Sequence, residues 1–174
     1  FLEPHGERCL FALDMPLSAP PAAKLRLGRV LRADRDLKKK TSFTLASALE
    51  YDTGLLPPWQ RKIALSLPEG GNPRARALAR KWRRESASEE GVVERLEAFF
   101  ADQGFIYTLT PRPVAGPDGV DHFLFVNREG FCGHFASAAA YLLRAAGTPS
   151  RVVSGYLGGE LNELGGFLKV RQAD

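Results

Sequence analysis

The sequence predicts an α+β protein, in which a β-rich region over residues 1–67 precedes a domain of helices and a β-hairpin over residues 68–174. Three observations support this class. Apolar residues recur at every second position within 41–51, recur at helical spacing from residue 72 onward, and form short runs between glycine pairs after residue 150. The predicted elements come in the order strands, helices and hairpin, which is typical of α+β folds rather than of alternating α/β folds.

The N-terminal region is expected to contain three strands, over residues 7–15, 24–33 and 41–51. The third has the clearest alternation, with Phe43, Leu45, Leu49 and Tyr51 on one side together with a serine. Cys9 lies in an apolar strand pattern, which favours a buried small hydrophobic role. The prolines of LLPPW end the sheet because proline cannot donate to a strand ladder.

Helical spacing follows. Asn72 is expected to cap a helix with Pro73 in its first position, and Ser86 or Ser88 to cap a second helix that ends at Gly104. The expected core stripe of the second helix is Val92, Val93, Leu96, Phe99 and Phe100. An extended segment at 105–111, a Pro- and Gly-rich loop at 111–119 and a compact apolar segment at 120–125 come next.

The last part is expected to be a helix and then β structure. CGHFASAAAYLLRAAG is a strong helix former, and Gly147 followed by Pro149 stops it. SRVVSGYLGGELNELGGFLKVRQ predicts a strand, a Gly-rich hairpin and a second strand.

Composition excludes several classes. A hydrophobic content of 44% and a charged content of 25% over 174 residues are those of a globular protein, and no apolar run reaches the length of a membrane span. Two cysteines and three scattered histidines give neither a disulfide framework nor zinc-ligand spacing, so no structural metal and no cofactor are expected. A start without Met favours a fragment of a longer protein.

The net charge of +4 comes largely from one basic cluster. Such a cluster either binds an anionic surface or is a solvated helix face, and the solvated face is the favoured interpretation. Without interleaved aromatic residues or a recognisable motif, nucleic-acid binding is not expected. The cluster consists of Arg74, Arg76, Arg80, Lys81, Arg83 and Arg84.

Cys132 is the candidate catalytic residue. It follows Gly130-Phe131 at the expected first turn of an alanine-rich helix, where the helix dipole stabilises a thiolate and unpaired N–H groups can hold an oxyanion. Gly130 is expected to let a substrate backbone approach, and Gly133 to keep the helix start slim. By itself, a cysteine at a helix start is more often structural.

The segment GFCGHFASAAAYLLRAAGTPSRVVSGYLGG resembles the transglutaminase-like fold, a relative of papain-like enzymes. VDHFLFVNREGFC and GGELNELGGFLKVRQAD are similar to the bacterial membrane-anchored proteins of the TgpA type, densely over 72–174 and loosely before. In that family the residue after the nucleophile is usually acidic, whereas here it is Gly133. The resemblance implies a membrane-anchored parent and a periplasmic domain.

The resemblance also implies the chemistry. Cys132 matches the nucleophile of a protein-glutamine γ-glutamyltransferase, which forms a thioester with a glutamine side chain and passes the acyl group to lysine, another amine or water. The matching His and Asp are expected beyond Asp174, which is itself not the triad aspartate, so the domain is expected to be truncated and this chain to be inactive. An uncovered hairpin is expected to favour self-association, unless the N-terminal region packs on it.

Two other interpretations stay open at this point. One is a cysteine peptidase or amidase that acts on peptide or cell-wall amides with the same triad, and the other is a non-catalytic periplasmic binding module. Neither His134, about 200° around the helix from Cys132, nor His122 is the favoured base, and His5 is uninformative. Asp121 and Glu129 are expected to be surface or capping groups.

Overall fold

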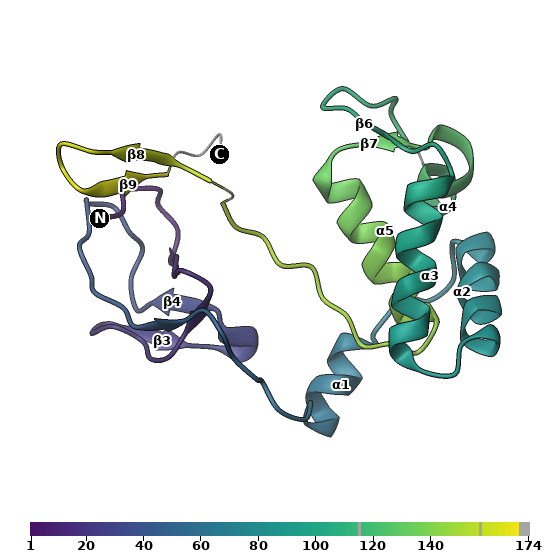
Figure 1. Cartoon of the computed structure of the whole chain (residues 1–174), viewed down its shortest axis with the longest axis horizontal. Helices are drawn as coiled ribbons and strands as arrows, with labels where there is room; N and C mark the ends of the chain where they lie inside the picture. Colours follow the sequence, from purple (N-terminus) through teal and green to yellow (C-terminus); the bar gives the residue numbers. More distant parts are fainter. Residues whose placement is uncertain (115, 157, 171–174) are drawn as a thin grey trace. The chain divides into compact units, whose positions relative to one another are not determined.

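The computed structural model of the chain describes residues 1–114, 116–156 and 158–170 (Figure 1). The expected second strand of the final hairpin runs into residues 171–172, and these, with Asp174, lie outside the described part. The chain forms two compact units. One is Leu56–Ser154, and the other combines Phe1–Leu55 with Gly155–Asp174. The fold is mixed α+β, with small sheets in the N-terminal region and a helical region after it.

The unit Leu56–Ser154 contains the helices. Its elements are α1 Pro58–Ala64, α2 Pro73–Glu85, α3 Glu89–Asp102, β6 Ile106–Tyr107, α4 Gly119–His122, the π-helix η2 Phe123–Asn127, β7 Glu129–Gly130 and α5 Cys132–Ala145. Helices α2, α3 and α5 pack against one another (Figure 1). The two-residue strands β6 and β7 pair in parallel immediately before α5. This pairing fixes where the first turn of α5 begins.

The sequence predicted the ends of these helices well. Pro73 begins α2, and the Ser88 hydroxyl accepts a hydrogen bond from the Gly91 N–H at the start of α3 (3.2 Å). Gly104 follows the end of α3 with a φ of +67°, and Gly147 follows α5 with a φ of +84°, a region in which glycine has no steric penalty. In contrast, the π-helix after α4 was not expected, because the segment was predicted only as compact and apolar.

The core of this unit is aromatic and alanine-rich. Four of the five residues of the expected stripe of α3 pack into it, with Val92 and Leu96 buried and Phe99 and Phe100 half-buried, whereas Val93 is not part of this cluster. On α2, Ala75, Ala79 and Trp82 are buried where that helix meets α5. Small side chains at such a contact allow two helices to approach closely, so the alanines of α2 and α5 set their separation.

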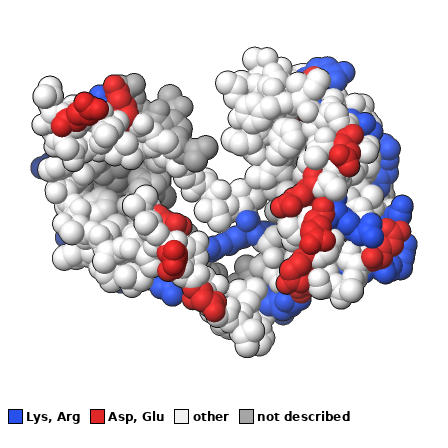
Figure 2. Space-filling model, viewed as in Figure 1, with Lys and Arg blue, Asp and Glu red and all other residues white. Residues whose placement is uncertain are grey.

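The charged surfaces of α2 and α3 have opposite sign (Figure 2). Part of the predicted basic cluster is engaged inside the unit. The guanidinium of Arg76 donates to the carbonyl oxygens of Pro68, Gly70 and Gly71, and that of Arg74 lies 4.2 Å from the centre of the Phe125 ring. The cluster therefore also holds the chain that leads into α2.

The other unit is built from short strands. Its elements are β1 Cys9–Leu10, β2 Met15–Pro16, β3 Ala23–Leu25, the 3₁₀-helix η1 Leu27–Arg29, β4 Leu31–Ala33, β5 Ser47–Ala48, β8 Glu160–Asn162 and β9 Phe167–Lys169. The sheet β1-β4-β3 is antiparallel, and β2 pairs with β5 and β8 with β9. The buried residues Leu10, Leu31, Ala33 and Leu37 form its small core.

Three expectations about β structure were wrong. Cys9 is exposed rather than buried, because in β1 the neighbouring Leu10 takes the inward position and alternate side chains point to opposite faces. The strand expected over 41–51 pairs only at Ser47–Ala48, although burial still alternates through Phe43 and Leu45. The strand expected from Arg151 is absent, because residues 151–156 have no ladder partner.

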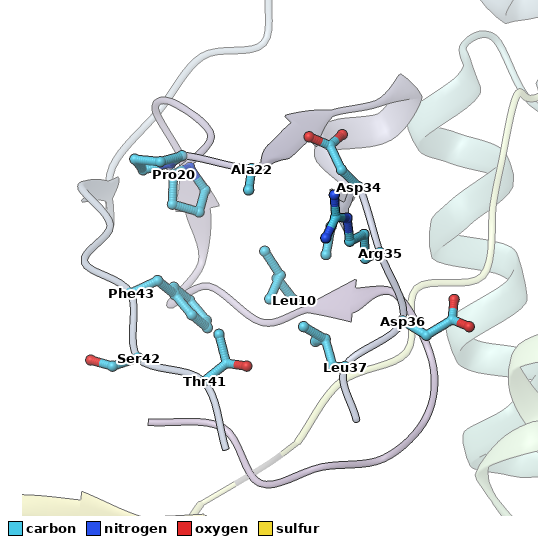
Figure 3. A pocket seen from close by; sticks show the side chains of 12 residues that line it. Leu10, Pro20, Ala22, Asp34, Arg35, Asp36, Leu37, Thr41, Ser42 and Phe43 are labelled. Carbon is cyan, nitrogen blue, oxygen red and sulfur yellow. The ribbon is translucent and has the colours of Figure 1, made fainter. Parts of the chain in front are cut away.

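A hollow of about 420 Å³ lies in this unit (Figure 3). Leu10, Leu37 and Phe43 form its apolar wall, and Asp34 and Arg35 lie at one side. Tyr156, which follows the helical unit, packs edge-on against Phe11 with ring centres 4.9 Å apart. The segment before the final hairpin thus contacts the N-terminal β region.

Candidate active site

Cys132 is the first residue of α5, and its side chain is exposed. The 14-residue helix begins directly after Phe131, which is extended and follows the last residue of β7. Among the described residues, the Cys132 thiol has no hydrogen-bond partner. An exposed thiol at the positive end of a helix dipole is placed for attack on an electrophile.

Two backbone N–H groups beside the thiol are also unpaired. The first-turn N–H groups of His134 and Phe135 donate to the Phe131 carbonyl (2.9 and 3.3 Å). Within the described chain, the N–H groups of Cys132 and Gly133 have no such acceptor. Unpaired N–H groups at a helix start can stabilise a developing oxyanion, so the first turn of α5 offers both a nucleophile and donors.

His134 closes the first turn of α5 on itself. Its Nδ1 accepts a hydrogen bond from the Phe131 backbone N–H (3.4 Å), and its ring meets the Phe131 ring edge-on with centres 4.4 Å apart. On its other side the ring lies 5.8 Å from that of Phe123. Because its acceptor nitrogen is engaged with the backbone, we assign His134 a structural role.

Gly130 has a different role from the expected one. A Cβ at this position would lie 2.7 Å from His134 Cβ and 2.8 Å from His134 Cγ. The absent side chain therefore makes room for the histidine, and not for a substrate backbone. At Gly133, an added Cβ would lie 3.0 Å from Cε2 of Phe131, so this glycine lets the Phe131 ring fold over the helix start.

The loop before α4 is tied to the strand that leads into Cys132. Oε1 of Glu129 accepts hydrogen bonds from the backbone N–H and from Nε of Arg112 (2.9 and 2.8 Å). This arginine holds the pKa of the Glu129 carboxyl below its usual value. Sequence reasoning placed Glu129 as a surface or capping group and missed Arg112, because the two residues are 17 apart and no local spacing links them.

A groove of about 600 Å³ runs beside the first two turns of α5, and we call it the α5 groove. It lies between the helix and the Pro- and Gly-rich loop that precedes α4. Phe131 and Gly133, the residues before and after Cys132 in the sequence, both line the groove. The residues that line it include Val114, Pro117, Val120, Phe131, Gly133 and Ser137.

Two buried polar side chains, Asn72 and Asp121, connect the loop beside the groove to the start of α2. Oδ1 of Asn72 accepts hydrogen bonds from the N–H groups of Val120 and Asp121 (2.9 and 3.0 Å). The Asp121 carboxylate in turn accepts from the N–H groups of Arg74 and Ala75 (2.9 and 2.7 Å). Asp121 is thus a capping group, as expected, although the helix that it caps is α2.

The remaining candidates lie away from these interactions. His5 is in the N-terminal region, where its Nδ1 accepts from the Glu7 N–H. Nδ1 of His122 is buried without a hydrogen-bond partner in the described structure. Neither histidine has a hydrogen bond to Cys132. Within the described residues, no group of three or more His, Cys, Asp or Glu side chains forms a metal-binding cluster.

Comparison with known proteins identifies the class. The model of the transglutaminase-like superfamily matches residues 76–174. This stretch includes Cys132, all of α5 and the Pro- and Gly-rich loop beside the α5 groove. The chain belongs to the transglutaminase-like superfamily.

The similar proteins are bacterial. The chain is 42% identical over 176 aligned positions to the protein-glutamine gamma-glutamyltransferase of Pseudomonas aeruginosa, with 99% of this chain and 26% of that protein covered. It is 36% identical over 103 positions to the uncharacterized protein YebA of Bacillus subtilis, with 58% of this chain and 14% of that protein covered. The chain therefore spans about a quarter or less of these relatives.

Two solved structures have the same fold. Both are of the periplasmic domain of TgpA from Pseudomonas aeruginosa, one of them bound to ethylmercury. Each has a TM-score of 0.91 and 41% identity over 98% of this chain, which covers 62% and 59% of the two solved chains. The resemblance that the sequence suggested is confirmed, including its extension into the N-terminal β region. Within the described residues, no helix is long and apolar enough to cross a membrane.

Proposed function

We propose that this chain carries the cysteine nucleophile of a protein-glutamine γ-glutamyltransferase, and that Cys132 is that nucleophile. One observation carries the proposal. The exposed thiol is the first residue of α5, beside two backbone N–H groups without acceptors in the described structure. The family match and the relative named as a protein-glutamine gamma-glutamyltransferase support it.

The reaction proceeds in two steps. The thiolate sulfur of Cys132 attacks the side-chain carbonyl carbon of a substrate glutamine, and the N–H groups of Cys132 and Gly133 stabilise the oxyanion. The C–N bond breaks, the nitrogen gains a proton and leaves as ammonia, and a thioester remains. The amine of a lysine or another primary amine then attacks the thioester, the C–S bond breaks, and an isopeptide bond forms.

A general base must take the thiol proton and return it to the leaving nitrogen. We do not assign this role to His134, whose Nδ1 is bound to the Phe131 N–H, or to His122, which has no hydrogen bond to the thiol. From the family resemblance, we propose that the base is a histidine on a strand that follows the final hairpin. We further propose that residues 68–174 form the transglutaminase-like domain after a β-rich region over 1–67, and that the domain is periplasmic, as in TgpA.

Amine incorporation tests this function. The full-length protein is incubated with a fluorescent primary amine and a glutamine-rich protein whose lysines are blocked. We expect incorporation that Cys132→Ala abolishes and that Cys9→Ala, the matched change at the other exposed cysteine, preserves. Incorporation that survives in Cys132→Ala would refute the assignment, and ammonia release without incorporation would show a hydrolase instead.

A further inference from the structure

We propose that the outer face of α2 adsorbs to a bilayer of anionic phospholipid. Most of the exposed residues of this helix are cations. We define the α2 basic face as Arg80, Lys81, Arg83 and Arg84, all of which are exposed. The inference goes beyond the proposed reaction, because it concerns the charge of one helix and shares with the proposed function only the periplasmic location.

The α2 basic face lies opposite the buried side of the helix. Trp82 is 6% exposed, and Arg80 and Arg84 are each two positions from it, which is about 200° around the helix. The buried side, with Ala75, Ala79 and Trp82, is where α2 meets α5. The α2 basic face is therefore directed away from α5, and a bilayer bound there would not cover that helix.

The charge of this face is largely uncompensated. Within the described chain, Arg80, Arg83 and Arg84 have no ion pair. The acid of α2, Glu85, pairs with Arg95 (3.1 Å) and at a longer distance with Lys81 (3.9 Å). Arg80 and Arg84, four positions apart, repel each other, and anions that lie against the face relieve this repulsion.

The helix dipole accounts for only part of the cluster. Arg83 and Arg84 are in the last turn, where a cation is stabilised by the negative end of the dipole. Arg80 and Lys81 precede that turn, and the effect of the dipole is confined to the last turn. These two cations require another explanation, which an external anionic surface supplies.

Acidic side chains are exposed on α3 instead (Figure 2). Glu90, Glu94, Glu97 and Asp102 are exposed there, with Arg95 as the exposed cation of that helix. The helical unit thus has a positive side and a negative side. The field of an anionic surface turns such a unit until its positive side faces the surface.

The partner that fits this face is extended rather than small. Neither of the hollows described above is lined by a residue of the α2 basic face, so a single small anion would not be enclosed there. The aromatic residue of α2, Trp82, is buried and offers no ring for a nucleic-acid base to stack on. An anionic bilayer presents many phosphates in one plane, and it bounds the periplasm in which we place the domain.

Co-sedimentation of the 174-residue chain with lipid vesicles tests the proposal. Vesicles of phosphatidylglycerol mixed with phosphatidylcholine are compared with vesicles of phosphatidylcholine alone. We expect binding to the mixed vesicles only. Raising the salt concentration from about 0.1 M to about 1 M, which shortens the screening length from about 10 Å to about 3 Å, should abolish it.

Replacing all four residues of the α2 basic face with glutamine keeps good helix-forming residues on α2. This variant should bind the mixed vesicles at least about 50-fold more weakly, since each Lys or Arg near an anionic surface contributes roughly fivefold. Should it fail to fold by circular dichroism, Arg83→Gln with Arg84→Gln removes half of the charge and should still weaken binding. The matched control removes four exposed cations from the other unit and should keep most of the binding. It carries Arg35→Gln, Lys38→Gln, Lys39→Gln and Lys40→Gln.

Binding to phosphatidylcholine alone, binding that salt does not weaken, or equal losses in the two fourfold variants would overturn the proposal. Binding to polyglutamate as tight as to the mixed vesicles would also overturn it, in favour of an acidic polypeptide as partner. Vesicle binding needs no thiol, so Cys132→Ala should bind like the wild type. Adsorption without amine incorporation would keep this inference and reject the transferase, and incorporation without adsorption would do the reverse.

Discussion

Asn72 and Asp121, which are 49 positions apart, each cap the helix on which the other lies. Asn72 is the N-cap residue of α2, yet its Oδ1 accepts from the first N–H groups of α4. Asp121 belongs to α4, yet its carboxylate accepts from the first N–H groups of α2. Both side chains are buried, so these reciprocal hydrogen bonds join the start of α4, beside the α5 groove, to the start of α2.

Asp121→Ala is expected to destabilise the protein by about 2 kcal/mol, because it leaves two buried helix-start N–H groups without an acceptor. Urea denaturation followed by circular dichroism measures the loss. Glu94→Ala, an exposed carboxylate of α3, is the matched control and should change the free energy of unfolding by less than about 0.5 kcal/mol. Equal effects of the two changes would contradict the capping role of Asp121.

Gly130→Ala is expected to cost about 1–3 kcal/mol, because the new Cβ overlaps the His134 side chain, which is close to the backbone and cannot swing away. The double variant Gly130→Ala with His134→Ala should recover much of this cost, and a double-mutant cycle of unfolding free energies measures the coupling. Gly155→Ala is the control, since its added Cβ meets nothing within 4 Å. Additive effects of the two changes would show that the two side-chain positions do not compete.

The Arg112–Glu129 contact is expected to depend on pH. The hydrogen bonds from Arg112 lower the pKa of Glu129, so the contact is intact above the ordinary glutamate value of about 4.3 and is lost as the pH falls through the lower value of the folded state. Hydrogen exchange at the Arg112 N–H, corrected for intrinsic rates, should show protection that persists down to the ordinary glutamate pKa and declines only at lower pH.

Glu129→Gln is the matched variant for this measurement. Its side-chain oxygen can still accept a hydrogen bond but does not titrate in this range, so protection of the Arg112 N–H should be weaker and independent of pH. A wild-type profile as flat as that of the variant would show that the carboxylate does not hold the loop.

Ser88→Ala is expected to cost about 1 kcal/mol, since the serine hydroxyl is an N-cap acceptor for α3. The same hydroxyl contributes, after the Glu90 backbone, to lowering the pKa of the Glu90 carboxyl. We therefore expect NMR titration of Glu90 to show a higher pKa in the variant than in the wild type. An unchanged titration together with unchanged stability would reject the cap.

Local sequence rules predicted the helical unit well. Pro73, Ser88, Gly104 and Gly147 mark helix ends because caps and turn residues act within a few positions of themselves. The placement of Cys132 at the start of α5 follows from the same rules. The α+β class and the superfamily were predicted correctly for the same reason, since short motifs carry them.

The sequence did not predict features that depend on contacts between distant residues. The Arg112–Glu129 and Asn72–Asp121 interactions join loops and helix starts that have no common periodicity. In the N-terminal region, alternation correctly predicted burial at Phe43 and Leu45 but could not show that most of that segment lacks a pairing strand. Cys9 was assigned to the wrong face because a two-residue strand has too little pattern to fix its orientation.

The most direct test of the proposed nucleophile is covalent trapping with a peptide in which a chloromethyl ketone replaces the glutamine carboxamide. The full-length protein is treated with the peptide and mapped by mass spectrometry. The proposed function predicts one adduct, on Cys132, with protection by excess glutamine peptide and no reaction at Cys9, which is also exposed. Equal labelling of both cysteines, or labelling that glutamine peptide does not reduce, would contradict it.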